Sequence, residues 1–192
     1  MNKAIFLDRD GVLNEIRADK EFYYKEGDII FFPKIFDALK IIKNKGYKIF
    51  VMTNQPVIAR GIASSEEIER LHKFMNQELG GMIEKFYMCP HHPEMHLDVP
   101  KHALKYRTAC NCRKPLPGMI FEAIKEFDLD LNKSWMVGDM ITDILCGKAA
   151  GCKTIQIFSP HSNKITKSAM AFDKNIEPDY HAIDLFEATK FL

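Results

Sequence analysis

Residues 4–11 read Ala-Ile-Phe-Leu-Asp-Arg-Asp-Gly, an apolar run followed at once by a charged turn. Four consecutive apolar residues before a glycine-containing turn predict a short strand that is buried on both faces. Asp8 and Asp10 then stand at the carboxyl end of this strand, where open α/β sheets bind their ligands. Two such carboxylates can hold a divalent cation, with one as a nucleophile and the other for proton transfer. A solvated Asp-Gly turn is the alternative for this stretch taken alone.

Beyond this stretch, the chain alternates between strand and helix patterns. Residues 33–45 carry an apolar stripe at helical spacing, with Pro33 at its start and Gly46 after it. Residues 47–52 form a second apolar run, so the first strand, this helix and this run predict a βαβ unit with parallel strands. Further helices are predicted after Ser65 as the N-cap, after Pro117-Gly118 and from Asp143, and further strands over 85–88, 135–138 and 154–158, before a short strand and a helix that reach Leu192. This alternation predicts an α/β fold, doubly wound, with a mainly parallel sheet and helices on both faces.

Three segments show no sustained period. Residues 12–32 follow the first carboxylates directly and are interpreted as a flap, because long irregular segments beside a site are often binding loops. Residues 92–109 and 159–178 are also expected to be irregular. Neither a repeat nor a linker interrupts the pattern, so residues 1–192 are predicted to form a single domain.

The composition is that of a globular protein without a bias toward nucleic acid or membranes. Hydrophobic residues make up 46% and charged residues 28%, and the formal net charge is +1. No apolar run approaches the roughly 18 residues that cross a bilayer. Residues 1–3 lead straight into a strand and leave no room for a signal peptide. We therefore expect a cytoplasmic protein, in which five cysteines indicate thiols or metal ligands rather than disulfides.

Polar residues follow three separate predicted strands. They are Asp8 and Asp10, Thr53 and Asn54, and Asp139 with Asp143, and Lys114 adds a cation just before another predicted helix. Because parallel strands end at one edge of a sheet, these groups are expected to meet there. They supply what phosphoryl transfer needs: a nucleophile, metal ligands, groups for the phosphoryl oxygens and an acid for the leaving group. The spacing of Asp139 and Asp143 places both on one side of a first helical turn, with helix capping as the alternative.

These stretches resemble the motifs of the haloacid dehalogenase-like phosphohydrolases. The matching stretches are Asp8-Arg9-Asp10-Gly11-Val12-Leu13-Asn14, Thr53-Asn54, Lys114, and Gly138-Asp139 with Asp143, in the order of that family. The resemblance implies an aspartyl-phosphate intermediate on Asp8, with Asp10 first protonating the leaving alcohol and then activating water. It also implies that Thr53, Asn54 and Lys114 bind phosphate or substrate. It further implies that Mg²⁺ is bound by Asp8, Asp10 through its backbone carbonyl, and Asp139, with Asp143 as a further ligand or as support behind them.

A second group of candidate metal ligands lies within residues 89–112. Cys89, His91, Cys110 and Cys112 supply three thiolates and an imidazole, which satisfy tetrahedral Zn²⁺ without an open position, as in structural zinc sites. The alternative is three unrelated core thiols beside a surface histidine. Other residues of these types are His92, His96 and His102, which are alternative ligands, and Cys146 and Cys152, which are interpreted as packed thiols.

Residues 53–55, 58–61, 89–93 and 112–115 narrow the resemblance to the heptose-bisphosphate phosphatases, which are related to the histidinol-phosphatases. This implies an enzyme with a zinc-bound loop in place of a large cap domain, which removes the C7 phosphate of a small sugar, D-glycero-D-manno-heptose 1,7-bisphosphate. It also implies that Arg113 binds the phosphate that remains, a role suited to a forked cation. We also expect a monomer. The 18 residues 92–109 favour the sugar bisphosphate, since histidinol-phosphatases have a much shorter stretch there.

The chain departs from this pattern at two places. Pro56-Val57 replaces small residues, and the flap has Glu21-Phe22-Tyr23 near the position of a Gly-Tyr pair. Both departures are expected to touch the substrate pocket, so they bear on the substrate rather than on the chemistry. Histidinol phosphate or another small phosphomonoester is the alternative substrate. A zinc-containing binding module is the alternative from a different functional class.

Overall fold

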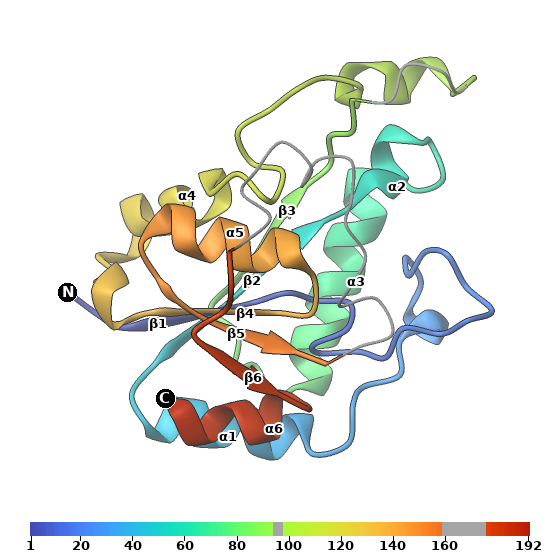
Figure 1. Ribbon diagram of the computed structural model, residues 1–192. Helices are drawn as coiled ribbons and strands as arrows, with labels where there is room; N and C mark the ends of the chain where they lie inside the picture. Colours follow the sequence, from blue (N-terminus) through green and yellow to red (C-terminus); the bar gives the residue numbers. More distant parts are fainter. Residues whose placement is uncertain (94–97, 159–175) are drawn as a thin grey trace.

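The computed structural model describes residues 1–93, 98–158 and 176–192, and these residues form a six-stranded parallel sheet (Figure 1). Its strands are β1 (Ala4–Leu7), β2 (Lys48–Asn54), β3 (Lys85–Cys89), β4 (Trp135–Gly138), β5 (Lys153–Ile157) and β6 (Tyr180–Ala182). The order is β3-β2-β1-β4-β5-β6, and every neighbouring pair is parallel. The chain winds outward in both directions from the centre, so β1 and β4 flank the switch point at which doubly wound sheets bind ligands.

Helices cover both faces of the sheet, as the alternation predicted. In Figure 1, α4 (Gly118–Phe127) and α5 (Ile141–Ala150) lie above the sheet, and α1 (Ile35–Asn44) and α6 (Leu185–Ala188) lie below it. The side chains of β1 alternate between the two core layers. Ile5 and Leu7 pack in the layer that includes α1, α6 and also α3 (Ser65–Glu78), whereas Ala4 and Phe6 pack in the layer of α4 and α5. All four residues are fully buried, which confirms the predicted buried strand.

The starts of α3 and α1 differ from the prediction. The N-cap of α3 is Ser64 rather than Ser65, because Ser64 has a glutamate three residues later and the two form a capping box. Ser64 Oγ accepts from the Glu67 amide at 3.2 Å, and a Glu67 carboxylate oxygen accepts from the Ser64 amide at 2.8 Å. Helix α1 begins at Ile35 rather than at Pro33, after Lys34 adopts a left-handed conformation with φ of 63°.

Short helices also occur in segments that were expected to be irregular. The predicted flap contains the 3₁₀ helix η1 (Glu26–Asp28), and residues 92–109 contain the 3₁₀ helix η2 (Lys101–Tyr106). The short helix α2 (Pro56–Ala59), which was not predicted, begins at a proline, a residue favoured at a first helical position. The remaining elements are the 3₁₀ helices η3 (Leu131–Lys133) and η4 (Thr189–Phe191). Most of the predicted loop 159–178 lies outside the described residues. Across the described ranges, no helix combines the length and apolarity that spanning a membrane requires.

Candidate active site

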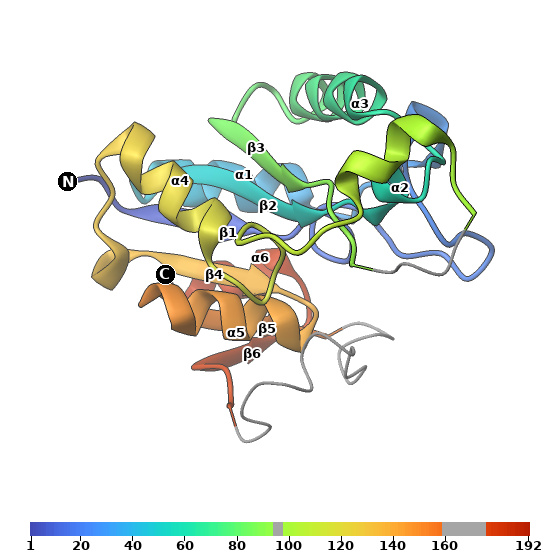
Figure 2. The ribbon, with the colours of Figure 1, turned by 90° about the horizontal axis from the view of Figure 1, so that it is seen from above.

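A cavity of about 450 Å³ opens at the carboxyl ends of β1, β2 and β4. Its lining includes Asp8, Asp10, Thr53 and Asp139, so the groups predicted from three strand ends do meet. Residues 16–18 and 20–23 of the predicted flap, residues 54–57 and Met140 line the rest. In Figure 2, the blue flap and α2 lie together at the end of the sheet toward which β2 points. The two departures from the family pattern, Pro56-Val57 and Glu21-Phe22-Tyr23, both line this cavity.

Two glycines let the carboxylates approach one another. Gly11 has φ of +88°, and a Cβ atom there would lie 2.7 Å from Cγ of Asp139. A Cβ atom on Gly138 would lie 2.2 Å from Cγ of Asp143. A side chain at Gly11 or Gly138 would collide with these carboxylates. The turn after β1 and the end of β4 can therefore approach them only because both positions are glycine.

Lys114 lies in the middle of the carboxylate group. Its side chain is only 2% exposed, and Nζ lies 2.9 Å from Oδ1 of Asp8 and 2.5 Å from Oδ1 of Asp143. Burial raises the pKa of Asp8 to about 7, against the opposing charge of Lys114. Burial would lower the pKa of Lys114, but the carboxylates of Asp143 and Asp8 outweigh it and raise that pKa. The lysine is thus held as a cation beside the predicted nucleophile.

The chemistry of this donor set fits a hard divalent cation. Carboxylate oxygens of Asp8, Asp139 and Asp143 lie within 4.8 Å of one another. Two buried carboxylates and the partly buried Asp8 beside one lysine leave an excess of negative charge, and oxygen ligands are those that Mg²⁺ prefers. Oδ2 of Asp143 accepts a hydrogen bond from the Met140 amide at 3.0 Å, while its Oδ1 faces Lys114. Since both of its oxygens already contact the protein, Asp143 is better suited to support the site than to be a principal ligand.

The helix geometry near Asp139 differs from the prediction. Helix α5 begins at Ile141 with Met140 as the N-cap, so Asp139 precedes the helix instead of lying in its first turn. Asp143 is the residue that bonds to the N-cap amide. The carboxylates of Asp139 and Asp143 are still neighbours, because Asp139 follows β4 directly and the Asp143 side chain packs against Gly138.

The side chain of Asn54 is bonded to the backbone of Lys114. Its Oδ1 accepts from the Lys114 amide at 3.0 Å, and its Nδ2 donates to the Lys114 carbonyl at 3.1 Å. Asn54 also lines the cavity, where it was predicted to bind phosphate or substrate. The reciprocal pair of bonds shows that Asn54 joins the end of β2 to the segment that carries the buried lysine. Thr53, only 1% exposed, lines the same cavity.

Sequence reasoning assigned no role to Arg9, which the structure places against Asp10. The arginine is fully buried, with Nε 3.0 Å from Oδ1 and Nη2 2.7 Å from Oδ2 of Asp10. Asn14 adds a third bond, from Nδ2 to Oδ1 of Asp10 at 3.0 Å. The only signal in the sequence was the position of an arginine between two candidate catalytic aspartates.

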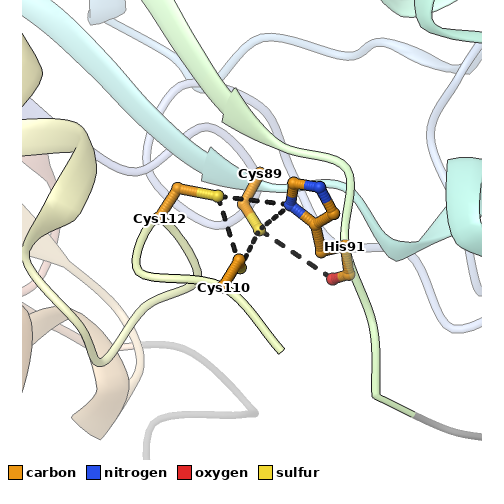
Figure 3. Close-up of side chains that lie close together, drawn as sticks. All are labelled: Cys89, His91, Cys110 and Cys112. Atoms are coloured by element: carbon orange, nitrogen blue, oxygen red, sulfur yellow. Dashed lines mark hydrogen bonds between the residues drawn. The ribbon is translucent and has the colours of Figure 1, made fainter. Parts of the chain in front are cut away.

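The predicted zinc ligands converge at the end of β3 (Figure 3). The Sγ atoms of Cys89 and Cys110 lie 3.5 Å apart, and those of Cys110 and Cys112 lie 3.3 Å apart. Nδ1 of His91 lies 3.4 Å from Sγ of Cys112 and 3.8 Å from Sγ of Cys89. Ligand atoms bound tetrahedrally at about 2.0–2.3 Å from zinc would lie about 3.3–3.8 Å apart. The donor set and its spacing therefore fit zinc.

The other histidines and cysteines differ from this group. Of the described histidines, His91 is the one that joins the three thiols, whereas His102 lies in η2 and His96 is outside the described residues. Cys146 and Cys152 are buried, and burial raises the pKa of both thiols to about 12. None of the five cysteines is paired in a disulfide.

Arg113 faces the cysteine and histidine group rather than the carboxylates. Its Nη1 donates to the His91 carbonyl at 3.2 Å. It lines a smaller cavity of about 200 Å³ with Pro93, Cys110 and Lys114, and is not among the described residues that line the larger cavity. This is the contact expected if Arg113 stabilises the loop, and its predicted contact with a distant substrate phosphate remains a prediction.

Comparisons with known proteins identify relatives whose named activity agrees with the chemistry of this site. Residues 111–188 match a family model described as HAD-hydrolase-like. The D-glycero-beta-D-manno-heptose-1,7-bisphosphate 7-phosphatase of Pasteurella multocida is 40% identical over 156 residues, which cover 80% of this chain and 79% of that protein. The D-glycero-alpha-D-manno-heptose-1,7-bisphosphate 7-phosphatase of Burkholderia mallei is 36% identical over 179 residues, which cover 91% of this chain and 89% of that protein.

A solved structure extends the likeness to the whole fold. It is that of D,D-heptose 1,7-bisphosphate phosphatase from B. bronchiseptica, complexed with magnesium and phosphate. Its TM-score is 0.77 at 26% identity, and the match covers 98% of this chain and 97% of that one. The sequence identity across four-fifths of the chain and the shared fold indicate the same family. The chain belongs to the haloacid dehalogenase-like phosphatases, in the group of the heptose-bisphosphate 7-phosphatases.

Proposed function

We propose that this protein removes the C7 phosphate of D-glycero-D-manno-heptose 1,7-bisphosphate, through an aspartyl-phosphate intermediate on Asp8. The observation that carries the proposal is the cavity at the switch point, which is lined by both carboxylates of the first motif, by Thr53 and by Asp139. The relatives named for this reaction support the substrate.

In the first step, a carboxylate oxygen of Asp8 attacks phosphorus, and the bond from phosphorus to the C7 oxygen of the sugar breaks. Asp10 gives its proton to that oxygen, so the sugar leaves as an alcohol. In the second step, Asp10 takes a proton from a water molecule whose oxygen attacks phosphorus. The bond from phosphorus to Asp8 then breaks, which restores the carboxylate and releases inorganic phosphate.

The remaining site residues would hold charge during both steps. Lys114, kept cationic between Asp8 and Asp143, and the hydroxyl of Thr53 would bind the phosphoryl oxygens. We assign Mg²⁺ to Asp8, Asp139 and the backbone carbonyl of Asp10, with Asp143 as support. When bound, this ion would offset the negative charge of the carboxylates and the phosphoryl group.

We further propose that residues 1–192 form one domain in which residues 12–32 act as a flap and residues 89–112 as a zinc-bound loop. Residues 16–23 line the cavity together with the carboxylates, which supports the first assignment. The tetrahedral spacing of Cys89, His91, Cys110 and Cys112 supports the second. In this proposal zinc is structural, because four protein ligands leave no open position. The monomeric state and cytoplasmic location remain predictions.

The test is phosphate release from a panel of substrates. The panel holds both anomers of the heptose bisphosphate, histidinol phosphate and fructose 1,6-bisphosphate, because the relatives are named for different anomers. We expect the highest kcat/KM for one of the heptose bisphosphates, with the Asp8→Asn variant as the control for contaminating phosphatases. A preference for histidinol phosphate would contradict the proposed substrate, and no release from any of them would contradict the proposed activity.

A further inference from the structure

We propose that Arg9 is a positioning residue that holds the Asp10 carboxylate in its working orientation and ties that orientation to the flap. This inference rests on the proposed role of Asp10 as the acid and base of the reaction. Arg9 itself lines no part of the cavity among the described residues, so it would act through Asp10 and not on the substrate.

The guanidinium of Arg9 binds both carboxylate oxygens of Asp10. Nε and Nη2 donate to the two carboxylate oxygens at 3.0 and 2.7 Å, a planar bidentate arrangement that fixes the rotation of the carboxylate as well as its place. The Asp10 side chain is 26% exposed, while Arg9 is fully buried. The buried arginine therefore fixes, from the protein interior, a carboxylate that faces the cavity.

The same nitrogen that binds Asp10 also binds the flap. Nη2 of Arg9 donates to the Tyr23 carbonyl at 2.8 Å. Tyr23 is 4% exposed, and its hydroxyl donates to the Arg17 carbonyl at 3.2 Å and accepts from the Arg17 amide. Arg17 and Tyr23 both line the cavity. One buried group thus connects the proposed acid to the segment that would cover the substrate.

The far side of the guanidinium is supported by His72 and Gln55. Nη1 of Arg9 lies 3.3 Å from Nε2 of His72, and this contact is a hydrogen bond only if that nitrogen carries a lone pair, so the imidazole is neutral. Burial, followed by the charge of Arg9, lowers the pKa of His72, which agrees with that form. In the amide orientation that satisfies its neighbours, the Gln55 oxygen accepts from Nη2 at 2.9 Å and from Nη1 at 3.2 Å. The arginine is therefore held on several sides, as a residue that sets a geometry should be.

A residue that acts through Asp10 should matter only where Asp10 matters. An alkoxide leaving group needs the proton from Asp10, whereas the nitrophenolate of p-nitrophenyl phosphate leaves without one. For a covalent mechanism, kcat/KM reports the steps up to release of this first product. Comparing kcat/KM for the two substrates therefore isolates the function of the acid.

The experiment measures Arg9→Gln, Arg9→Lys, Asp10→Asn and the double variant Arg9→Gln/Asp10→Asn on both substrates. General acid catalysis contributes about 10²–10⁴-fold, so we expect Arg9→Gln to lose about 10–100-fold on the heptose bisphosphate and less than about 3-fold on p-nitrophenyl phosphate. Arg9→Lys keeps the charge but cannot form the bidentate contact, and should show the same selectivity with a smaller loss. In the double variant, the loss should be no larger than that of Asp10→Asn alone.

Two further sets of variants separate positioning from loss of fold. Asp179→Asn removes another ion pair, with Lys148 at 2.7 Å, far along the sheet from the cavity, and should affect the two substrates equally. His72→Leu removes the support of Arg9 and should lose about 3–10-fold selectively, whereas His72→Gln keeps an acceptor and should retain activity. The His72 pair provides the test even if Arg9→Gln does not fold.

The outcomes distinguish the two proposals. If Asp10→Asn lowers kcat/KM equally for both substrates, the proposed role of Asp10 fails and the inference with it. If Asp10→Asn is selective for the alkoxide leaving group but the Arg9 and His72→Leu variants are not, only the positioning role is wrong. Additive losses in the double variant would also contradict it.

Discussion

Lys114 and Asp8 form a buried ion pair, with the lysine nitrogen 2.9 Å from Oδ1 of the aspartate. The pair joins the end of the central strand β1 to the segment before α4, and the backbone of Lys114 is fixed in turn by Asn54. Removing one partner of a buried ion pair costs about 3–5 kcal/mol, so truncating Lys114 would reduce stability and activity together. Substitutions that keep the size of the side chain, or that lie outside this pair, therefore give clearer tests of the chemistry.

The first prediction concerns Asp8→Asn. The amide has nearly the size of the carboxylate but cannot attack phosphorus, so phosphate release should fall by at least about 10³-fold. Lys114 keeps Asp143 as a partner at 2.5 Å, so the fold should survive. Circular dichroism and thermal unfolding check the fold, and a phosphate-release assay checks turnover. Normal turnover by the folded variant would rule out the covalent mechanism.

Arg113 provides a test of substrate recognition. If it contacts the distant phosphate, Arg113→Ala should lower kcat/KM for a bisphosphate far more than for a monophosphate. A charge-assisted hydrogen bond is worth about 1.5–3 kcal/mol, or roughly one to two decades, and much of the effect should appear in KM. The alternative is that Arg113 only supports the loop through the His91 carbonyl. Equal losses on the two substrates, together with loss of zinc, would establish that alternative.

The zinc proposal predicts about one zinc per chain in protein purified without chelators. Cys110→Ser should lose the metal, whereas Cys152→Ser, a matched change at a buried thiol outside the cluster, should retain it. Chelation should make residues 89–112 sensitive to proteolysis before the sheet unfolds, because the cluster joins the two ends of this loop. Metal-free protein with full activity and an unchanged digestion pattern would mean that the cluster is incidental.

The buried His72 is expected to make the stability of the protein depend on pH. Its pKa in the folded protein is lowered, first by burial and then by Arg9, so below the unfolded value of about 6.5 only the unfolded chain binds the proton. The free energy of unfolding should therefore decrease as the pH falls through about 6.5, and this component is absent above that value. His72→Gln removes this pH-dependent contribution. The difference in the free energy of unfolding between the wild type and His72→Gln should therefore shrink from about pH 8 to about pH 5. Urea unfolding of both proteins across this range measures it, and parallel profiles would show that His72 does not titrate on unfolding.

The fold and the meeting of the strand ends could be predicted because their signals are local. A buried apolar run, a glycine turn and a helix of matching length specify each βαβ unit, and parallel strands then bring Asp8, Thr53 and Asp139 to one edge. The N-cap of α3 was placed one residue late, since adjacent serines differ only in which has Glu67 three positions later. The different start of α5 places Asp139 before the helix, yet the carboxylates of Asp139 and Asp143 remain neighbours.

Contacts between distant side chains could not be predicted in the same way. His72 lies on the buried face of α3, where the apolar spacing places it in the core but does not say that it faces Arg9. Asn54 lies at the carboxyl end of β2, where a substrate-binding residue is expected, yet its amide bonds to the Lys114 backbone. Arg113 adjoins Lys114 in the sequence but points toward the cysteine and histidine group. In each case the residue type and location were informative, and the partner depended on the packing of separate elements.

In the proposed reaction, Asp8 carries the phosphoryl group taken from C7 of the heptose bisphosphate. Rapid mixing with the bisphosphate, acid quenching at millisecond times and peptide mass spectrometry would locate any phosphoryl group on the protein, and ³¹P NMR would identify the sugar product. We expect phosphorylation of the peptide that contains Asp8 before phosphate appears in solution, with heptose 1-phosphate as the product. Release of phosphate with no phosphorylated protein at any time, or retention of the phosphate at C7 in the product, would contradict the proposed reaction.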